Sequence, residues 1–119
     1  MSGIQSFKDL KIWQLGMDIV ADVYNLTEKF PREELYGLTS QMRRAAVSIS
    51  ANIAEGFRRY HPKEHKQFLA IAMGSAAELE TELLLGQRLK FISGDDLKAL
   101  FSMLESLGRM LTVVIRRFK

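Results

Sequence analysis

The stretch that decides the fold is residues 37–60, which read GLTSQMRRAAVSISANIAEGFRRY. At 100° per residue, its apolar and small side chains return to one helical face, within about 60° of Leu38. The members of this face are Leu38, Met42, Ala45, Ile49, Ile53 and Gly56. The pattern predicts a helix over residues 38–60 whose apolar face enters a core.

A polar line runs along the same helix beside that face, and consists of Gln41, Arg44, Ser48, Asn52, Glu55 and Arg59. The far side is again small or apolar, at Val47, Ala51 and Ala54. A helix that is apolar nearly all round is usually buried on more than one side. We therefore expect it to pack inside its own domain and also against another molecule, which predicts an oligomer.

Three further stretches show the helical period, over residues 7–30, 62–91 and 94–118. Ser6 followed by Asp9 resembles a capping box, and Ser93 followed by Asp96 is a second cap signature. The expected core residues of the first helix are Leu10, Trp13, Met17, Val20, Tyr24 and Leu26. Those of the third are Phe68, Ala72, Ser75, Leu79, Leu83 and Gly86, and the fourth contributes Leu97, Leu100, Phe101, Leu104, Leu107, Leu111, Val114 and Phe118.

Length and composition fit one all-α domain over residues 1–119. The chain is 47% hydrophobic, has two prolines, and carries no run that alternates as a strand would. Short connections force neighbouring helices to run in opposite directions, so we expect an antiparallel up-down-up-down four-helix bundle. The chain has no cysteine, its first ten residues show no apolar region typical of a signal peptide, and no apolar run reaches the length of a membrane span. We therefore expect a cytoplasmic protein without membrane contact.

The residue patterns of common enzymes are missing. A di-iron bundle needs Glu-x-x-His motifs, and positions 58 and 62, three residues before the histidines, are Arg and Pro. His61 and His65 are four apart but have no obvious third ligand, so we interpret them as a surface pair. There is no glycine-rich phosphate loop, and no histidine accompanies Ser48 or Ser75 as a catalytic base. We expect no catalytic residue, no metal and no cofactor.

The polar line and two carboxylates of the third helix predict a structural network in the seam between helices. Its members are Gln41, Arg44, Ser48, Asn52, Glu55, Glu78 and Glu82. Within it we expect Arg44 to be largely buried and bonded to a carboxylate of Glu55, Glu78 or Glu82, because a buried guanidinium needs such a partner. The alternative is a catalytic or ligand-binding use of the same residues.

The net charge is +3, and the expected topology concentrates it. The chain start, the second turn and the chain end meet at one end of such a bundle, whereas the opposite end receives Glu28, Glu33, Glu34, Asp95 and Asp96. Nine of the 17 basic residues would gather at the first end, namely Lys8, Lys11, Arg58, Arg59, Lys63, Lys66, Arg116, Arg117 and Lys119. This set is a candidate nucleic-acid-binding surface, with a solvated surface as the alternative.

Four blocks of sequence resemble a known family: FKDLKIWQ, FPREELYGLTSQMRRAAVSISANIAEGFRR, FLAIAMGSAAELETELLLG and LKFIS. Together they resemble, over nearly the whole chain, the bacterial 23S rRNA-intervening sequence proteins, a family of four-helix bundles of unknown function. The resemblance implies an up-down-up-down bundle and suggests a homopentamer. Many relatives have proline where this chain has Ser50, which puts in doubt a kink at that position.

The family is similar in fold to the accessory variability protein of diversity-generating retroelements, a basic barrel that binds nucleic acid and a reverse transcriptase. By resemblance, RNA or DNA and a reverse-transcriptase-like protein are the expected partners. We therefore expect a non-enzymatic oligomeric bundle that binds nucleic acid, or a nucleic-acid enzyme, through its basic end. The alternative is a structural or scaffolding homo-oligomer that binds no nucleic acid.

Overall fold

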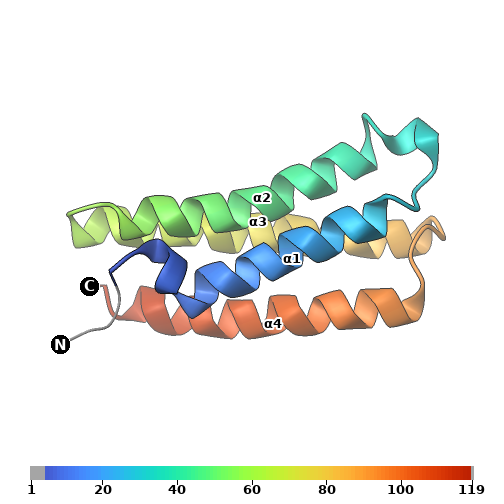
Figure 1. Ribbon diagram of the computed structural model, residues 1–119. Helices are drawn as coiled ribbons and strands as arrows, with labels where there is room; N and C mark the ends of the chain where they lie inside the picture. The colour runs from blue at the N-terminus through green and yellow to red at the C-terminus, as the bar shows by residue number, and fades with distance from the viewer. Residues whose placement is uncertain (1–4, 119) are drawn as a thin grey trace.

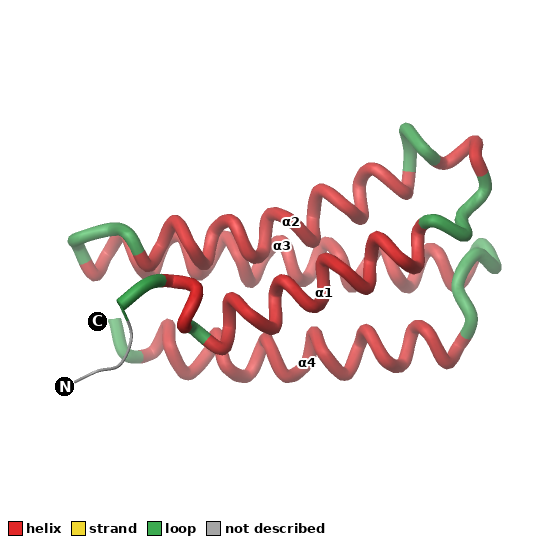
Figure 2. Tube along the Cα trace, in the orientation of Figure 1, coloured by secondary structure: helices red, strands yellow, loops and turns green. Residues whose placement is uncertain are grey.

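The computed structural model describes residues 5–118, and these fold into four α-helices and two short 3-10 helices, with no strand among them (Figure 2). The α-helices are α1 (Lys11–Thr27), α2 (Leu38–Phe57), α3 (Pro62–Arg88) and α4 (Gly94–Arg116), and the 3-10 helices are η1 (Phe7–Asp9) and η2 (Arg32–Glu34). The predicted all-α class with four helices is confirmed. Each predicted α-helix ends two or three residues earlier than expected, because the last residues close the turns.

The helices form an elongated bundle of 48 × 25 × 22 Å. Helix α2 packs against α1 and most extensively against α3, and α4 closes the bundle by packing against both α3 and α1. Figure 1 shows successive helices running in opposite directions, as short connections require. Therefore η1, the end of α4 and the α2–α3 turn lie at one end of the bundle, and the other two connections lie at the opposite end.

Local signals set most helix boundaries. The hydroxyl of Ser93 accepts a hydrogen bond from the backbone N–H of Asp96 at 3.2 Å and caps α4. Pro62 occupies the first turn of α3, where its missing N–H costs nothing. Helix α2 continues through Ser50 without a break in its helical backbone.

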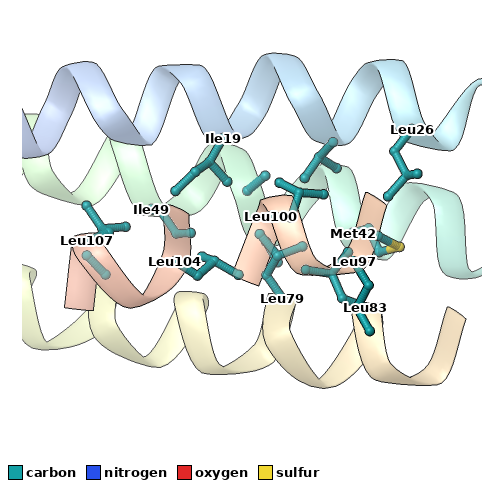
Figure 3. Packing of buried hydrophobic residues seen from close by; sticks show 14 of the residues in the cluster. Ile19, Leu26, Met42, Ile49, Leu79, Leu83, Leu97, Leu100, Leu104 and Leu107 are labelled. Carbon is teal, nitrogen blue, oxygen red and sulfur yellow. The ribbon is translucent and has the colours of Figure 1, made fainter. Parts of the chain in front are cut away.

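The core lies along the bundle axis and is built mainly from aliphatic side chains. Those of α2, α3 and α4 interdigitate with Ile19 and Leu26 of α1, as Figure 3 shows. The predicted core face of α2 is buried at every position, and so are the predicted leucines of α4 from Leu97 to Leu111. The 3.6-residue period therefore identified these two faces correctly.

For α1 the predicted face was wrong by about one position. The buried residues are Ile12, Gly16, Ile19, Val23, Leu26 and Thr27. Of the predicted core residues, Leu26 is among them, whereas Met17 and Tyr24 remain 44% and 41% exposed. Two neighbouring lines of α1 are both apolar, and close approach of α1 to α2 selects the one that contains Gly16. A Cβ atom at Gly16 would lie 2.6 Å from Oγ of Ser50, so only glycine fits without movement.

The start of the first helix was also predicted wrongly. The capping box of Ser6 and Asp9 exists, but it caps η1 rather than an α-helix. Leu10 then adopts an extended conformation (φ −75°, ψ 128°), and α1 begins only at Lys11. An α-helix cannot pass through an extended residue, so the first residues leave the line of α1 and form a separate turn.

Candidate functional site

The predicted basic residues lie at one end of the bundle, which we call the basic end. Eight of them lie within the described residues, and all eight are exposed: Lys8, Lys11, Arg58, Arg59, Lys63, Lys66, Arg116 and Arg117. Lys119 lies outside the described residues. The eight come from the chain start, the α2–α3 turn and the end of α4, which Figure 1 places together. Antiparallel topology thus brings together residues up to about a hundred positions apart in sequence.

Two of these arginines are held by aromatic rings. The guanidinium of Arg58 lies 5.3 Å from the ring centroid of Phe7, and that of Arg59 lies 4.7 Å from the ring centroid of Phe68. Arg59 also donates to a carboxylate oxygen of Glu55 one turn earlier. These contacts orient both guanidinium groups, and cation–π contacts of this kind leave the positive charge in place.

The carboxylates near the basic end neutralise little of its charge. Both ion pairs found among residues 5–118 join residues one turn apart on a single helix, and only Arg59–Glu55 belongs to this end. The carboxylate of Asp9 accepts from the backbone N–H groups of Gln5 and Ser6 at 3.1 and 3.2 Å. The described residues of the basic end therefore include eight basic side chains against the three acidic side chains of Asp9, Glu55 and Glu64.

An aromatic residue of this end was missed from the sequence. Tyr60 follows the two arginines in the α2–α3 turn and is 96% exposed. An aromatic ring beside phosphate-binding cations is a typical stacking surface for unpaired bases. The signal was a tyrosine that ended the helical pattern without belonging to its apolar face.

The polar network between α2 and α3 is smaller than predicted. Oγ of Ser48 and Oγ of Ser75 lie 2.8 Å apart, and Nδ2 of Asn52 donates to the carbonyl and the hydroxyl of Ser48 at 2.8 and 3.0 Å. These three half-buried residues link the two helices midway along their length. Gln41, Glu55 and Glu78 are exposed instead and lie outside this contact.

The prediction that Arg44 is buried was wrong. Arg44 is exposed, and within residues 5–118 it forms no ion pair with Glu55, Glu78 or Glu82. Small serine side chains meet between α2 and α3 at this level, so the helices approach too closely to enclose a guanidinium and a carboxylate. Arg44 faces solvent beside a surface groove lined by Tyr24, Tyr36 and Val47.

Glu82 is the buried charged residue of the predicted network, with 7% of its surface exposed. Its Oε1 atom has no hydrogen-bond partner among the described residues. Burial, with a smaller contribution from the charge of Glu78 one turn earlier, raises the pKa of Glu82 from 4.5 to about 7. Near neutral pH, a substantial fraction of Glu82 is thus protonated, and the side chain has no ion-pair partner among the described residues.

Within the described part of the chain, the two histidines do not belong to a group of metal-ligating side chains. Among residues 5–118 there is no group of three or more His, Asp or Glu side chains able to hold a metal ion. His61 is exposed, whereas the imidazole of His65 stacks on the ring of Phe118 at 5.1 Å with an interplanar angle of 4°. No helix in the described part of the chain is long and apolar enough to cross a membrane.

The sequence profile of the 23S rRNA-intervening sequence proteins matches residues 8–113. The chain belongs to this family. Its fold is similar to the crystal structure of a protein of unknown function from the S23 ribosomal protein family of Bacteroides thetaiotaomicron, with a TM-score of 0.81 at 22% identity. That similarity covers 87% of this chain and 97% of the other. No curated protein matches the chain. Neither the family description nor the description of that crystal structure names an enzymatic activity.

Proposed function

We propose that the protein is a non-enzymatic, self-associating bundle that binds the backbone of RNA or DNA through its basic end. The observation that carries this proposal is the convergence of eight exposed cations from three segments at one end. Phosphate contacts of Lys and Arg supply most sequence-independent affinity for nucleic acid. A nucleic-acid enzyme is the protein partner that we propose for such a complex.

Two features favour phosphate binding over a merely solvated surface. Arg58 and Arg59 are already oriented against Phe7 and Phe68, so less side-chain freedom is lost when they bind. Tyr60 adds an exposed ring in the same turn, on which an unpaired base can stack. The expected ligand is therefore a single strand or a duplex end, recognised with little sequence preference.

Self-association is supported by the outward side of α2. Val47 is 44% exposed and Ala51 is exposed, although both are small or apolar residues on the side of α2 that faces away from the core. Val47 also lines the groove with Tyr24, Leu35 and Tyr36, which are exposed as well. A second copy of the chain would cover this side, and a ring of copies would multiply the charge of the basic end.

The test is binding of a labelled single strand and a labelled duplex at about 50 and 200 mM salt. The variant replaces Arg58, Arg59, Arg116 and Arg117 with Gln. The matched control replaces Lys29, Arg32, Lys90 and Lys98, which are exposed at or near the opposite end, with Gln and changes the net charge equally. We expect the affinity of the native chain and of the control to fall steeply with salt concentration. For the variant, the slope of log affinity against log salt concentration should become shallower by about 0.7 to 0.9 for each phosphate contact removed.

The second candidate function is a scaffolding homo-oligomer without nucleic-acid binding, favoured by the apolar outer side of α2 alone. It would replace the first if the native chain bound neither strand type, or if the variant and its control bound equally well. In that case the basic end is a solvated surface.

A further inference from the structure

A cavity of about 600 Å³ opens at the basic end, in the size range of small-molecule pockets. All four α-helices line it. Its deepest residues belong to the core: Ile12 of α1, Ile53 of α2 and Leu69 of α3. Met110 and Val114 of α4 form the wall opposite α2. The cavity is thus an extension of the apolar core toward the surface.

The cavity exists because α1 starts late. The extended residue Leu10 interrupts the helix, and η1 turns aside, where the ring of Phe7 packs edge-on against Trp13 at 5.3 Å. Helices α2, α3 and α4 continue past this level, so the end of the bundle has the walls of three helices and only the first turn of the fourth. Apolar surface that a longer α1 would cover remains open.

The rim of the cavity carries positive charge. Lys11 and Arg117 both line it and are both exposed, and neither forms an ion pair with any carboxylate among residues 5–118. Beside them, the stacked pair of His65 and Phe118 forms part of the wall. Asp9, the acidic residue nearest to Lys11 in sequence, is occupied by the backbone of Gln5 and Ser6.

We propose that this cavity binds an amphipathic carboxylate with one unbranched alkyl chain, of the fatty-acid class. The chain would lie against Ile53, Leu69 and Val114, and the carboxylate would lie between Lys11 and Arg117. The deep wall offers aliphatic side chains and no polar side chain, so a nucleobase or sugar placed there would lose hydrogen bonds to water without replacement. An alkyl chain has no such groups to satisfy, and charge complementarity fixes which end faces outward.

The experiment is calorimetric titration of the purified chain, without nucleic acid, with hexanoate, octanoate and decanoate below their micelle concentrations. We expect one saturable site per chain and an affinity that rises about fourfold with each added methylene, the factor that corresponds to burying one CH₂ group. Decyltrimethylammonium, whose alkyl tail is one carbon longer than that of decanoate and whose head group is positive, should nevertheless bind at least about tenfold more weakly than decanoate.

Two pairs of variants locate the site. Val113→Glu places a negative charge at a 51% exposed position of the mouth, and Leu89→Glu makes the same change at a 47% exposed position at the opposite end. Lys11→Gln with Arg117→Gln removes the rim charges, and Arg88→Gln with Lys98→Gln is its matched control. The two mouth variants should weaken decanoate binding by about tenfold or more, and the two controls should not. Circular dichroism checks that all four chains are folded.

Three results would each overturn the proposal. The first is the absence of saturable binding of decanoate to the native chain. The second is equal binding by the mouth variants and their controls. The third is equal affinity for the positively charged amphiphile, because that result would indicate a detergent-like association without a role for the rim charges. None of these outcomes depends on whether nucleic acid binds.

Discussion

Ser48 of α2 and Ser75 of α3 share a hydrogen bond between their hydroxyl groups, with an Oγ–Oγ distance of 2.8 Å. Nδ2 of Asn52 donates to the carbonyl and hydroxyl of the same Ser48. The bond joins residues 27 positions apart and fixes how far α2 is shifted along α3. Because the helices are antiparallel, Glu82, two turns further along α3, lies at the same level of the bundle as Gln41, two turns back along α2, although Gln41 itself faces solvent.

A double-mutant cycle at these two positions measures the contact. Ser48→Ala and Ser75→Ala should each lower the free energy of unfolding by about 1 kcal/mol, the usual worth of such a hydrogen bond. The double variant should lose less than the sum, because the second substitution removes a hydroxyl that has already lost its partner. Chemical denaturation gives the three values, and strict additivity would contradict a direct contact. Ser102→Ala, at an exposed position of α4, is the control and should change little.

Because α1 and α2 approach closely at Gly16 and Ser50, we expect the effect of a substitution at position 16 on stability to depend strongly on the side chain at position 50. Gly16→Ala places a Cβ atom 2.6 Å from Oγ of Ser50 and should cost about 1 to 3 kcal/mol, although alanine favours a helix. In a Ser50→Ala background the clash is gone, and Gly16→Ala should be neutral or stabilising. Thermal unfolding of the four chains tests this, and an equal cost in both backgrounds would refute the contact.

The raised pKa of Glu82 predicts how stability changes with pH. The folded chain holds this proton more tightly than the unfolded chain, with a pKa of about 7 against 4.5. The stabilising contribution is therefore complete below about pH 4.5 and disappears as pH rises through about 7. Glu82→Gln stays neutral, so near pH 8.5 it should be more stable than the native chain by about 3 kcal/mol, and similar to it near pH 4.5.

Denaturation of both chains across this pH range measures the difference. Glu80→Gln, at an exposed position of the same helix, is the control. The difference in stability between this variant and the native chain should not change with pH. A constant difference between the Glu82→Gln and native chains at all pH values would show that Glu82 does not titrate in this range.

The exposed apolar side of α2 predicts assembly in solution. Light scattering at micromolar concentration should give a mass several times that of one chain. Val47→Glu should lower this mass, because a carboxylate on a covered apolar side must be desolvated without a partner. Met17→Glu, at a position of equal exposure on α1, is the matched control and should leave the mass unchanged. A native chain that is monomeric at every concentration would exclude self-association.

Much of this fold was determined by the sequence alone. The spacing of Leu38, Met42, Ile49 and Ile53 places all four side chains on one face of a helix, and the short connections require neighbouring helices to be antiparallel. The meeting of both chain ends with the α2–α3 turn at the basic end follows from these two facts. Local periodicity and connection length are properties of the chain itself, so no contact had to be known.

The tertiary structure decided what periodicity leaves open. Two adjacent lines of α1 are apolar, and the contact of Gly16 with Ser50 selects the buried one. Likewise, the stripe from Gln41 to Glu55 is polar in the sequence, but only packing shows that Ser48 and Ser75 meet while Arg44 remains in solvent. Such choices depend on interhelical distance, which side-chain sizes from two separate segments set jointly.

The cavity is the clearest case of a feature that only the assembled fold contains. Ser6 and Asp9 predict a helix start, and the capping box is present, yet Leu10 breaks the helix and α1 begins late. As a result, apolar residues of α2, α3 and α4 at the basic end are not covered by α1, and they line the cavity. A local sequence pattern predicts the backbone conformation of its own segment. The open apolar surface of the cavity depends instead on where four separate segments end relative to one another, and folding alone brings these segments together.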